Sequence, residues 1–600
     1  MNKSIPVFYQ AELDRCEAEI NRYESLINRY SFLRLFLLIA GIFLFYQSLK
    51  IDQSWIPVLV FFIVTFVFAS LVRKQNQFEK RRNYFRDLAK IYTNELNSLD
   101  RKDTIYPDGS EWSDDLHPYT SDLDIFGKGS LFELMNRCAT RNGNVKLAEW
   151  LKKAAPVELI RDRQLAVKEL SSIKSWKYNF QAVLLFSNKA DQDYAQNLFQ
   201  FMNTANGTNA VWFRSYIRWI PWLFLVTAIL SWYISFFLLL LISLGIVNLL
   251  FMQHFSARVM RADSLIGKMS RILDRFSEAL SAIKQQTWRS GLLQELSAGI
   301  HNEEKRKLPE QIKRLSVLIN NLNFGLSTIG PVLNFIMVWN VRQLFAIDDW
   351  KRENKINMEL AFDMIASFEA IISLSSLNSN YPRWTFPAIN EQENYTLNAK
   401  AIGHPLISSG LRVENDFTLT NDLKIDIITG SNMAGKSTFL RTLGINIVLA
   451  LSGAPVCAAK MELSPMLVFS YMRIRDSLNE STSTFKAELD RLQALLRILD
   501  SAEKVYFLID EMLRGTNSVD RYLGSRAVIE RLISQKAVGI IATHDLQIAD
   551  LEEKYPDYIR NFHFDIQVEG EEMKFDYKLK SGECKTFNAQ MLLKRLGISF

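Results

Sequence analysis

The first half of the chain carries long uncharged runs that come in two pairs. Leu35 to Leu49 and Trp55 to Val72 are separated by a short polar turn, which is typical of two helices joined as a hairpin. A helix that spans a bilayer needs about 20 apolar residues, so the second run is long enough and the first relies on its flanks. The stretch 219–253 contains no charged residue and would be about 50 Å long as one helix. We therefore predict a second pair of spans that turns near residues 231–235.

Basic residues flank both predicted hairpins. Because cytoplasmic loops are enriched in Lys and Arg, these flanks predict a multi-pass membrane protein with about four spans, whose long segments are all cytoplasmic. The alternative is that the runs are buried core helices of a soluble protein, but two hairpins with matched basic flanks argue against it. The flanking residues are Arg29 and Arg34, the basic segment from Arg73, and then Arg214, Arg218, Arg258 and Arg261.

The last third of the chain contains a predicted strand that leads into a glycine-rich loop. The segment "LKIDIITG" predicts a strand, and a glycine-rich loop and a helix follow it. In this context the pattern Gly-x4-Gly-Lys-Ser predicts a loop that wraps around the phosphates of ATP, with Lys436 on the β and γ phosphates and Ser437 on Mg²⁺. The nucleotide-binding residues of the loop are Gly430, Ser431, Asn432, Met433, Ala434, Gly435, Lys436, Ser437 and Thr438.

Two further predicted strands end in polar residues. "KVYFLIDEM" ends in Asp510 and Glu511, which suits a division in which Asp510 holds the metal through water and Glu511 positions the attacking water. "AVGIIATHD" delivers His544 at its C-terminal end, where ligands of parallel sheets collect. Beside the other two motifs, His544 is a candidate sensor of the γ-phosphate.

The run Leu315 to Val341 is also uncharged, but it contains five asparagines together with Gly325 and Pro331. A fifth span there would place the nucleotide site outside the cell, away from ATP. We therefore predict that this run forms a buried helix.

These motifs, taken in order, resemble those of the MutS mismatch-repair ATPases in the ABC-type ATPase superfamily. The resemblance covers roughly residues 400–600, and weaker matches from Ser130 and from Phe368 bracket a helical arm. It implies an α/β P-loop (ABC-type) ATPase domain at the C-terminus, preceded by a mainly α-helical core and lever region that carries two transmembrane hairpins. The matching segments are "GHPLI" at 403, "END" at 414, "TGSNMAGKSTFLR" at 429, "GAPVCA" at 453, "STSTFKAEL" at 481, "LIDEMLRGTNSVDR" at 508, "ATHDL" at 542 and "RNFHF" at 560.

The resemblance also implies partners for the site. Ser483 would be presented to the γ-phosphate of a partner's ATP, with Asp520 at the same interface, so that the site is composite and the chain a homodimer. His544 would be the switch histidine. Arg412 and Tyr577 would hold the two faces of the adenine.

The chain departs from mismatch-recognising relatives in its N-terminal half. The Phe-x-Glu wedge of those relatives is matched only at Phe276-Ser277-Glu278, within an amphipathic pattern typical of packing. There is little room for a connector domain between Arg73 and Ser130, and we expect the C-terminal dimerisation element to be trimmed at Phe600. Mismatch recognition is therefore not supported.

The amino-acid composition does not identify a binding partner. Lys and Arg total 71 and Asp and Glu 65, a net charge of +6 that names neither DNA nor lipid. The basic and aromatic cluster after Arg73 directly follows a span, which favours lipid headgroups. The four cysteines show no CxxC pair, which argues against a disulfide framework or a zinc site; they are Cys16, Cys138, Cys457 and Cys584.

We predict from the sequence a membrane-anchored MutS-like ATPase that moves helical levers, with DNA left open as its cargo. A half-transporter is the rival reading, although "LSGAP" at 451 lacks the position and residues of a transporter signature; a membrane scaffold that uses ATP as a conformational latch is a third. The predicted divisions are an N-terminal helix 1–34, a first hairpin 35–72, a juxtamembrane helix and linker 73–120, a core region 121–215, a second hairpin 219–253, a lever region 256–385 and an ATPase domain 386–600.

Overall fold

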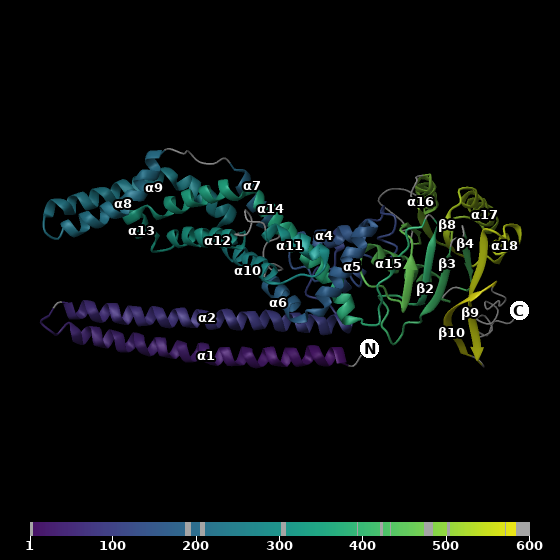
Figure 1. The fold of residues 1–600 in the computed structure, drawn as a ribbon, viewed down its shortest axis with the longest axis horizontal. Helices are drawn as coiled ribbons and strands as arrows, with labels where there is room; N and C mark the ends of the chain where they lie inside the picture. Colours follow the sequence, from purple (N-terminus) through teal and green to yellow (C-terminus); the bar gives the residue numbers. More distant parts are fainter. Residues whose placement is uncertain are drawn as a thin grey trace.

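The molecule is elongated, with an α/β domain at one end and two helical arms that point away from it (Figure 1). The structure is a computed structural model, and it describes residues 4–53, 55–185, 194–204, 211–301, 308–392, 394–420, 424–431, 434–472, 484–500, 504–569 and 572–583.

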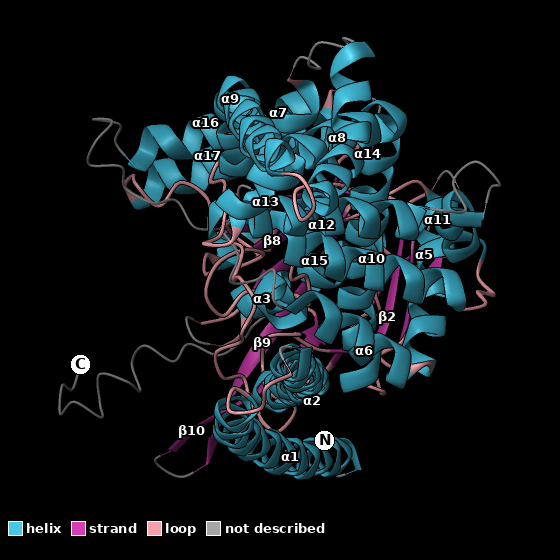
Figure 2. Ribbon diagram, turned by 90° about the vertical axis from the view of Figure 1, so that its left-hand side faces the viewer, coloured by secondary structure: helices cyan, strands magenta, loops and turns pink. Residues whose placement is uncertain are grey.

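The first arm is a pair of long antiparallel helices, α1 (Ser4–Ser48) and α2 (Trp55–Leu99). They lie side by side along their length in both ribbon views (Figures 1 and 2). The Tyr23 and Phe85 rings stack at 6.0 Å between the two helices. Each helix runs without a break from its charged stem into its apolar tip. The predicted division between an N-terminal helix ending at residue 34 and a separate span therefore falls inside α1.

The second arm is built around a hairpin of α8 (Val211–Leu230) and α9 (Ser235–Ile266), with the turn at residues 231–234. Beside it lie α12 (Leu308–Gly325), the short α13 (Gly330–Met337) and the start of α14 (Trp339–Asn380), which continues to the α/β domain. The prediction of one buried helix over 315–341 is wrong, because the chain breaks between Gly325 and Gly330 and again at Val338.

Short helices form the core region between the arms and the α/β domain. In α10 (Ser270–Gln285), the Phe276 side chain is buried and its ring meets that of Phe362 edge-on at 5.1 Å. The predicted packing role of this Phe-x-Glu triplet is confirmed. The other helices here are α3 (Leu131–Met135), α4 (Arg141–Lys152), α5 (Val157–Ser172), α6 (Lys174–Leu184), α7 (Tyr194–Asn203) and α11 (Gly291–His301), with 3₁₀ turns η1 (Ser110–Trp112) and η3 (Gly267–Met269).

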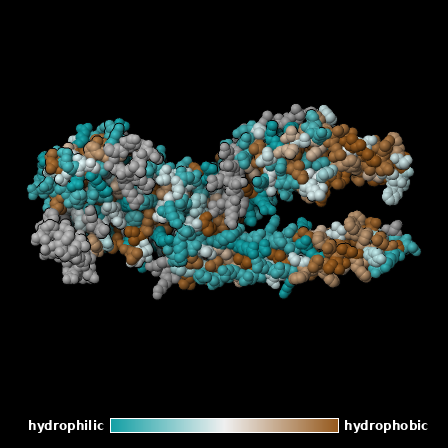
Figure 3. All heavy atoms as spheres, turned by 180° about the vertical axis from the view of Figure 1, so that it is seen from behind, coloured by the Kyte–Doolittle hydropathy of each residue, from teal (hydrophilic) through white to brown (hydrophobic). Residues whose placement is uncertain are grey.

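Within the described residues, four helical segments are long and apolar enough to cross a membrane: Ser4–Ser48, Trp55–Leu99, Ser235–Gln285 and Met358–Asn380. The apolar window of Met358–Asn380 is 89% buried inside the protein, so it is a core helix. The predicted span in α8 is not among the four; its first half carries Arg214 and Arg218. Apolar side chains gather at the far ends of both arms, on the same end of the molecule (Figure 3).

The α/β domain contains two sheets. The larger has the strand order β10-β9-β4-β8-β7-β6, in which all neighbours are parallel except β10 and β9. Its strands are β4 (Ile425–Thr429), β6 (Leu467–Tyr471), β7 (Val505–Asp510), β8 (Val538–Ala542), β9 (Ile559–Glu569) and β10 (Glu572–Ser581). The smaller sheet has the order β1-β5-β2-β3, from β1 (Ala388–Ile389), β2 (Thr396–Ile402), β3 (Asn415–Thr420) and β5 (Lys460–Leu463). Helices α15 (Lys436–Ser452), α16 (Thr484–Leu499), α17 (Ser518–Ser534) and α18 (Leu551–Lys554) and the turn η4 (Leu546–Ile548) accompany the sheets.

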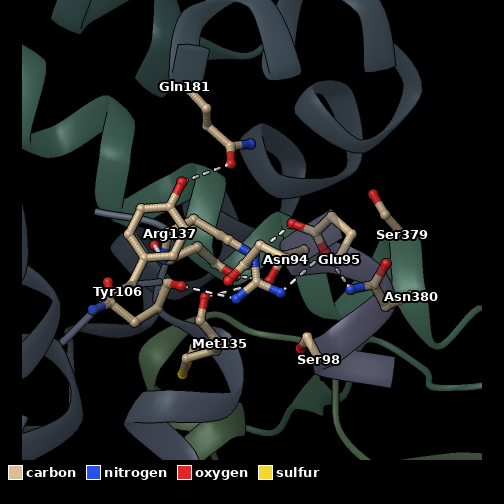
Figure 4. Close-up of polar contacts among 12 residues, drawn as sticks. Asn94, Glu95, Ser98, Tyr106, Met135, Arg137, Gln181, Ser379 and Asn380 are labelled. Atoms are coloured by element: carbon tan, nitrogen blue, oxygen red, sulfur yellow. Dashed lines mark hydrogen bonds and ion pairs between the residues drawn. The ribbon is translucent and has the colours of Figure 1, made fainter. Parts of the chain in front are cut away.

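A buried ion pair joins the first arm to the core (Figure 4). Glu95 near the end of α2 binds Arg137 through two contacts, at 2.5 and 3.0 Å. Asn380, at the end of α14, donates to Glu95 at 2.7 Å and accepts a hydrogen bond from Tyr9 of α1 at 2.6 Å. Burial opposes the charge of Glu95, but the Arg137 guanidinium outweighs it and lowers the pKa of that carboxyl. We call these four residues the clasp, since they hold both helices of the first arm to the end of α14.

The segment 101–122, whose Pro, Gly and acidic residues are typical of a linker, packs against the α/β domain instead. Arg491 of α16 donates to the carbonyl oxygens of His117 and Pro118 at 2.9 and 2.8 Å. Asp122 accepts from the Ser470 hydroxyl of β6 at 2.8 Å. The predicted boundary between a linker ending at 120 and a core region starting at 121 therefore divides a single packed segment.

Candidate nucleotide site

Three neighbouring parallel strands bring the predicted motifs to one edge of the large sheet. β4 pairs with β8, and β8 with β7, so that Ile428 and Asp510 both lie opposite Ala542. The loops that follow these three strands therefore leave the sheet side by side, at the carboxyl ends where ligands of parallel sheets bind.

The loop after β4 depends on two glycines with positive φ. Gly430 has φ 142°, and a Cβ there would lie 2.8 Å from the carbonyl oxygen of Phe564. Gly435 has φ 104°, and its Cβ would lie 3.0 Å from the Tyr577 ring. Lys436 begins α15 and its ammonium donates to the carbonyl oxygens of Gly430 and Ser431, at 2.7 and 2.9 Å. Asn432 and Met433 lie outside the described residues.

The acidic pair stands opposite this loop. Ser437 is hydrogen-bonded to Asp510; burial raises the pKa of Asp510 and this hydrogen bond partly offsets the rise. A hydroxyl and a carboxylate at this contact are hard oxygen donors of the kind that Mg²⁺ prefers, so the pair fits the predicted metal site.

Glu511 has a backbone that is unusual for its side chain. Its φ is 57°, in the left-handed region, and its N–H donates to the Ala542 carbonyl at 2.9 Å. The carboxylate is held between two cationic or polar partners, His544 Nδ1 at 3.3 Å and Arg514 Nε at 3.2 Å. Such conformations cost free energy and are found where a side chain must be aimed, as at active sites. Glu511 lines both the cavity that Lys436 lines and the smaller pocket that His544 and Arg514 line.

A cavity of about 440 Å³ extends from the loop and contains both residues predicted to hold adenine, Arg412 and Tyr577. Asn415 donates to the Tyr577 carbonyl oxygen at 3.0 Å, which ties the two walls together. The loop contributes Ser431, Gly435, Lys436, Ser437 and Thr438 to the lining, whereas Gly430 and the buried Ala434 shape the loop behind it.

Some predicted residues are not brought to this cavity. Asp520 is exposed at the start of α17, where its N–H donates to the Asn517 side chain at 2.9 Å. Ser483 lies outside the described residues. His544 is next to Glu511 but lines a smaller adjoining pocket with Arg514. The roles of Ser483 and Asp520 at a dimer interface therefore stay predictions.

Three residues of the site were missed by sequence reasoning. Arg514 contacts both carboxylates, at 3.7 Å from Asp510 and 3.2 Å from Glu511. His404 and Asn415 line the cavity. The signal for Arg514 was available, since it follows Asp510 by four residues within the acidic motif; His404 and Asn415 lie inside matched segments whose ligand roles are not evident from residue type.

A glycine-rich loop at a helix N-terminus, a lysine, a hydroxyl with a carboxylate and a second aimed carboxylate form the constellation that P-loop nucleotide sites use. Comparison with known proteins relates this part of the chain to one family. Residues 426–590 match the family model described as MutS domain V.

Similar full-length proteins are DNA mismatch repair proteins. "DNA mismatch repair protein MutS" of Thermotoga maritima is 30% identical over 290 residues, which are 46% of this chain and 35% of the relative. The protein of the same description from Persephonella marina is 32% identical over 222 residues, 36% of this chain and 25% of the relative. "DNA mismatch repair protein MutS 2" of Halobacterium salinarum is 34% identical over 186 residues, 30% of this chain and 21% of the relative. The chain thus spans about a third or less of these relatives, and the similarity supports a MutS relationship for its C-terminal part.

Proposed function

We propose that this protein is a membrane-anchored, MutS-like ATPase that hydrolyses ATP to move its helical lever. The observation that carries the proposal is that Lys436, Ser437, Glu511, Arg412 and Tyr577 converge on one cavity, within the segment similar to MutS domain V. Phosphate-binding and base-binding groups that line a single cavity suit a nucleotide better than a free phosphate.

The chain's own residues would divide the work of hydrolysis. The α15 N-terminus and Lys436 bind the phosphates, and Ser437 with Asp510 would hold Mg²⁺, which when bound neutralises phosphate charge. Glu511 orients the attacking water, and His544 and Arg514 fix the direction of its carboxylate. Arg412 and Tyr577 bind the base.

The two arms support a membrane location for the ATPase and a path by which it could move them. The apolar tips of both arms and the basic residues beside them support anchoring in a membrane, with the α/β domain on the cytoplasmic side. The lever helix α14 connects the second arm to the start of the α/β domain. In this proposal two copies close over their nucleotides, with Ser483 and Asp520 at the shared interface, and hydrolysis reopens them.

Replacing Lys436 by Ala tests the site. We expect ATP turnover in nanodiscs to be abolished and nucleotide affinity to fall, because the phosphates lose their cationic ligand. Lys460→Ala is the matched control, since Lys460 is exposed on β5 and does not line the cavity. Undiminished turnover in Lys436→Ala would refute the site assignment.

DNA as cargo is tested separately, by measuring turnover with duplex, mismatched and branched DNA over a salt titration. Stimulation by one form that weakens with salt would support a DNA-handling role, because phosphate contacts release counterions. An unchanged rate with every form would argue against DNA as the effector and direct the search to protein or lipid partners, whereas a very slow basal rate would favour a membrane scaffold that uses ATP as a latch.

A further inference from the structure

The uncharged segment 315–341 returns to the second hairpin after the break at Gly325. The short helix α13 packs against both α8 and α9. Phe335 is the centre of this contact: its ring meets that of Phe224 edge-on at 5.8 Å, and it lies so close to Gly245 that a Cβ there would be 2.0 Å from the ring. The contact leaves no room for a side chain at Gly245.

The depth of α13 follows from its partners. Gly245 is ten residues into α9, about 15 Å from the hairpin turn, and Phe224 is six residues before the end of α8, about 9 Å from the turn. The hydrocarbon core of a bilayer is about 30 Å thick. In the membrane arrangement proposed above, α13 therefore lies within the hydrocarbon core.

Ion pairs mark the cytoplasmic boundary on the other side of α13. Arg214 of α8 binds Asp349 at 2.8 Å, and Arg258 of α9 binds Asp348 at 2.7 Å. Asp348 and Asp349 lie about three helical turns after the end of α13. The charged layer and the hairpin turn thus enclose α13 from both ends.

Asparagine side chains pair with carbonyl oxygens at both breaks, although the Asn340 Oδ1 atom is buried without a hydrogen-bond partner among the described residues. Asn334 and Asn340 donate to the Gly325 carbonyl oxygen at 3.4 and 3.1 Å, and Asn248 of α9 donates to the carbonyl oxygens of Phe335 and Ile336 at 2.7 and 3.3 Å. Irregular backbone is tolerated at membrane depth only where other groups of the protein pair with it. The asparagines, which argued against a membrane location in the sequence, therefore supply hydrogen bonds that irregular backbone needs at that depth.

The outer face of this segment is apolar. Ile329 and Val332 are 54% and 56% exposed, and Phe324 and Leu326 are also exposed. No charged residue lies between Leu315 and Val341. An exposed apolar face that continues the apolar surface of the hairpin is suited to acyl chains.

We propose that residues 324–337 form a re-entrant membrane element that enters from the cytoplasmic side, reaches the middle of the bilayer beside the α8–α9 hairpin and contacts lipid acyl chains. This inference rests on the proposed membrane anchoring. Because α14 begins two residues after α13, the far end of the lever is set in the bilayer, and nucleotide-driven movement of the lever is delivered to lipid.

Spin labels at single cysteines test the element in nanodiscs. Cys584 is replaced by Ser and the buried Cys16, Cys138 and Cys457 are kept. Labels are placed at Val332→Cys and, as an independent position, Ile329→Cys. Leu239→Cys on the exposed face of α9 is the reference for lipid, and Leu360→Cys on α14, twenty-two residues beyond Val338, is the reference for water.

We expect labels at 332 and 329 to collide more with oxygen than with a water-soluble nickel chelate, as the label at 239 does, and the label at 360 to show the reverse. Labels at both 332 and 329 that behave like the label at 360, with 239 still in lipid, would overturn the re-entrant element and leave the anchoring intact. A label at 239 that is open to the nickel chelate would instead overturn the membrane anchoring, and this inference with it.

Discussion

Glu511 owes its position to a left-handed backbone and to contacts with His544 and Arg514. We predict that Glu511→Gln lowers ATP turnover by at least about 10²-fold, because the amide cannot accept a proton from the attacking water. Nucleotide affinity should change little. Turnover is measured beside Glu553→Gln, whose exposed side chain lies outside the cavity and should leave the rate unchanged. Equal rates in the two variants would contradict the role of Glu511.

His404 makes the cavity wall sensitive to acid. Burial, with the Arg441 charge nearby, lowers its pKa to about 4, and its Nδ1 accepts the Leu406 N–H at 3.2 Å, as a neutral ring does. Unfolding frees the ring to bind a proton below its ordinary pKa near 6.5, so stability is complete above that pH and is lost as pH falls toward 4. The loss is on the order of 3 kcal/mol at most.

We predict that His404→Asn flattens this dependence, since the Asn oxygen can accept the same hydrogen bond without titrating. Thermal unfolding of the α/β domain at pH 7 and pH 5 measures it: the parent should lose more stability on acidification than the variant does. Parallel losses in both proteins would mean that other groups control the acid response.

The residues of the site differ in whether the local sequence alone predicts their role. Gly435, Lys436 and Ser437 are adjacent in the chain, so their spacing alone predicts a common task. Arg412 lies in the loop before β3 and Tyr577 in β10, far apart in sequence, so only resemblance to a family could pair them. His404 had no signal of its own, because a buried histidine is recognised by its surroundings and these come from segments distant in sequence.

At the scale of single elements, the contact between Gly245 and Phe335 decides how closely α13 can approach the hairpin. We predict that Gly245→Ala destabilises the second arm by about 1–3 kcal/mol, because the added methyl must displace the ring. Ser243→Ala, on the exposed face of the same helix, should stay within about 0.5 kcal/mol of the parent. Thermal unfolding in nanodiscs compares the two, and similar midpoints would contradict the tight contact.

Apolar runs predict which segments are helical better than where helices end. The turn between α8 and α9 falls where the sequence has polar and aromatic residues between two apolar stretches. The sequence did not reveal that α1 and α2 each continue from a charged stem into an apolar tip. Charged and apolar residues both form helices, so a change from one kind to the other does not mark a helix end. The break at Gly325 was missed because an uncharged run predicts burial and says nothing of continuity, whereas Gly325, Gly330 and Pro331 weaken the helix at that point.

At the scale of the whole molecule, the clasp joins the first arm to the end of α14. We predict that Arg137→Met destabilises the protein by about 3–5 kcal/mol, since it leaves Glu95 buried without its partner. The matched control is Arg86→Met, which breaks an exposed pair with Glu24 in the same arm and should cost about 1 kcal/mol or less. Denaturant unfolding measures both, and Glu95→Gln combined with Arg137→Met should recover part of the loss.

The packing of segment 101–122 against the α/β domain could not be predicted, because its Pro, Gly and acidic residues are typical of a linker. The segment is held by hydrogen bonds from Arg491, which follows His117 by 374 residues in the chain. Sequence patterns of this kind identify loops but not the surfaces on which loops lie.

The unbroken α2 helix also sets a distance between the membrane surface and the α/β domain. From Arg73 to Leu99 it is about 40 Å long, so in the proposed arrangement it acts as a strut of constant height between headgroups and ATPase domain. A partner that bridged the headgroups and the ATPase domain along this helix would therefore have to span about 40 Å.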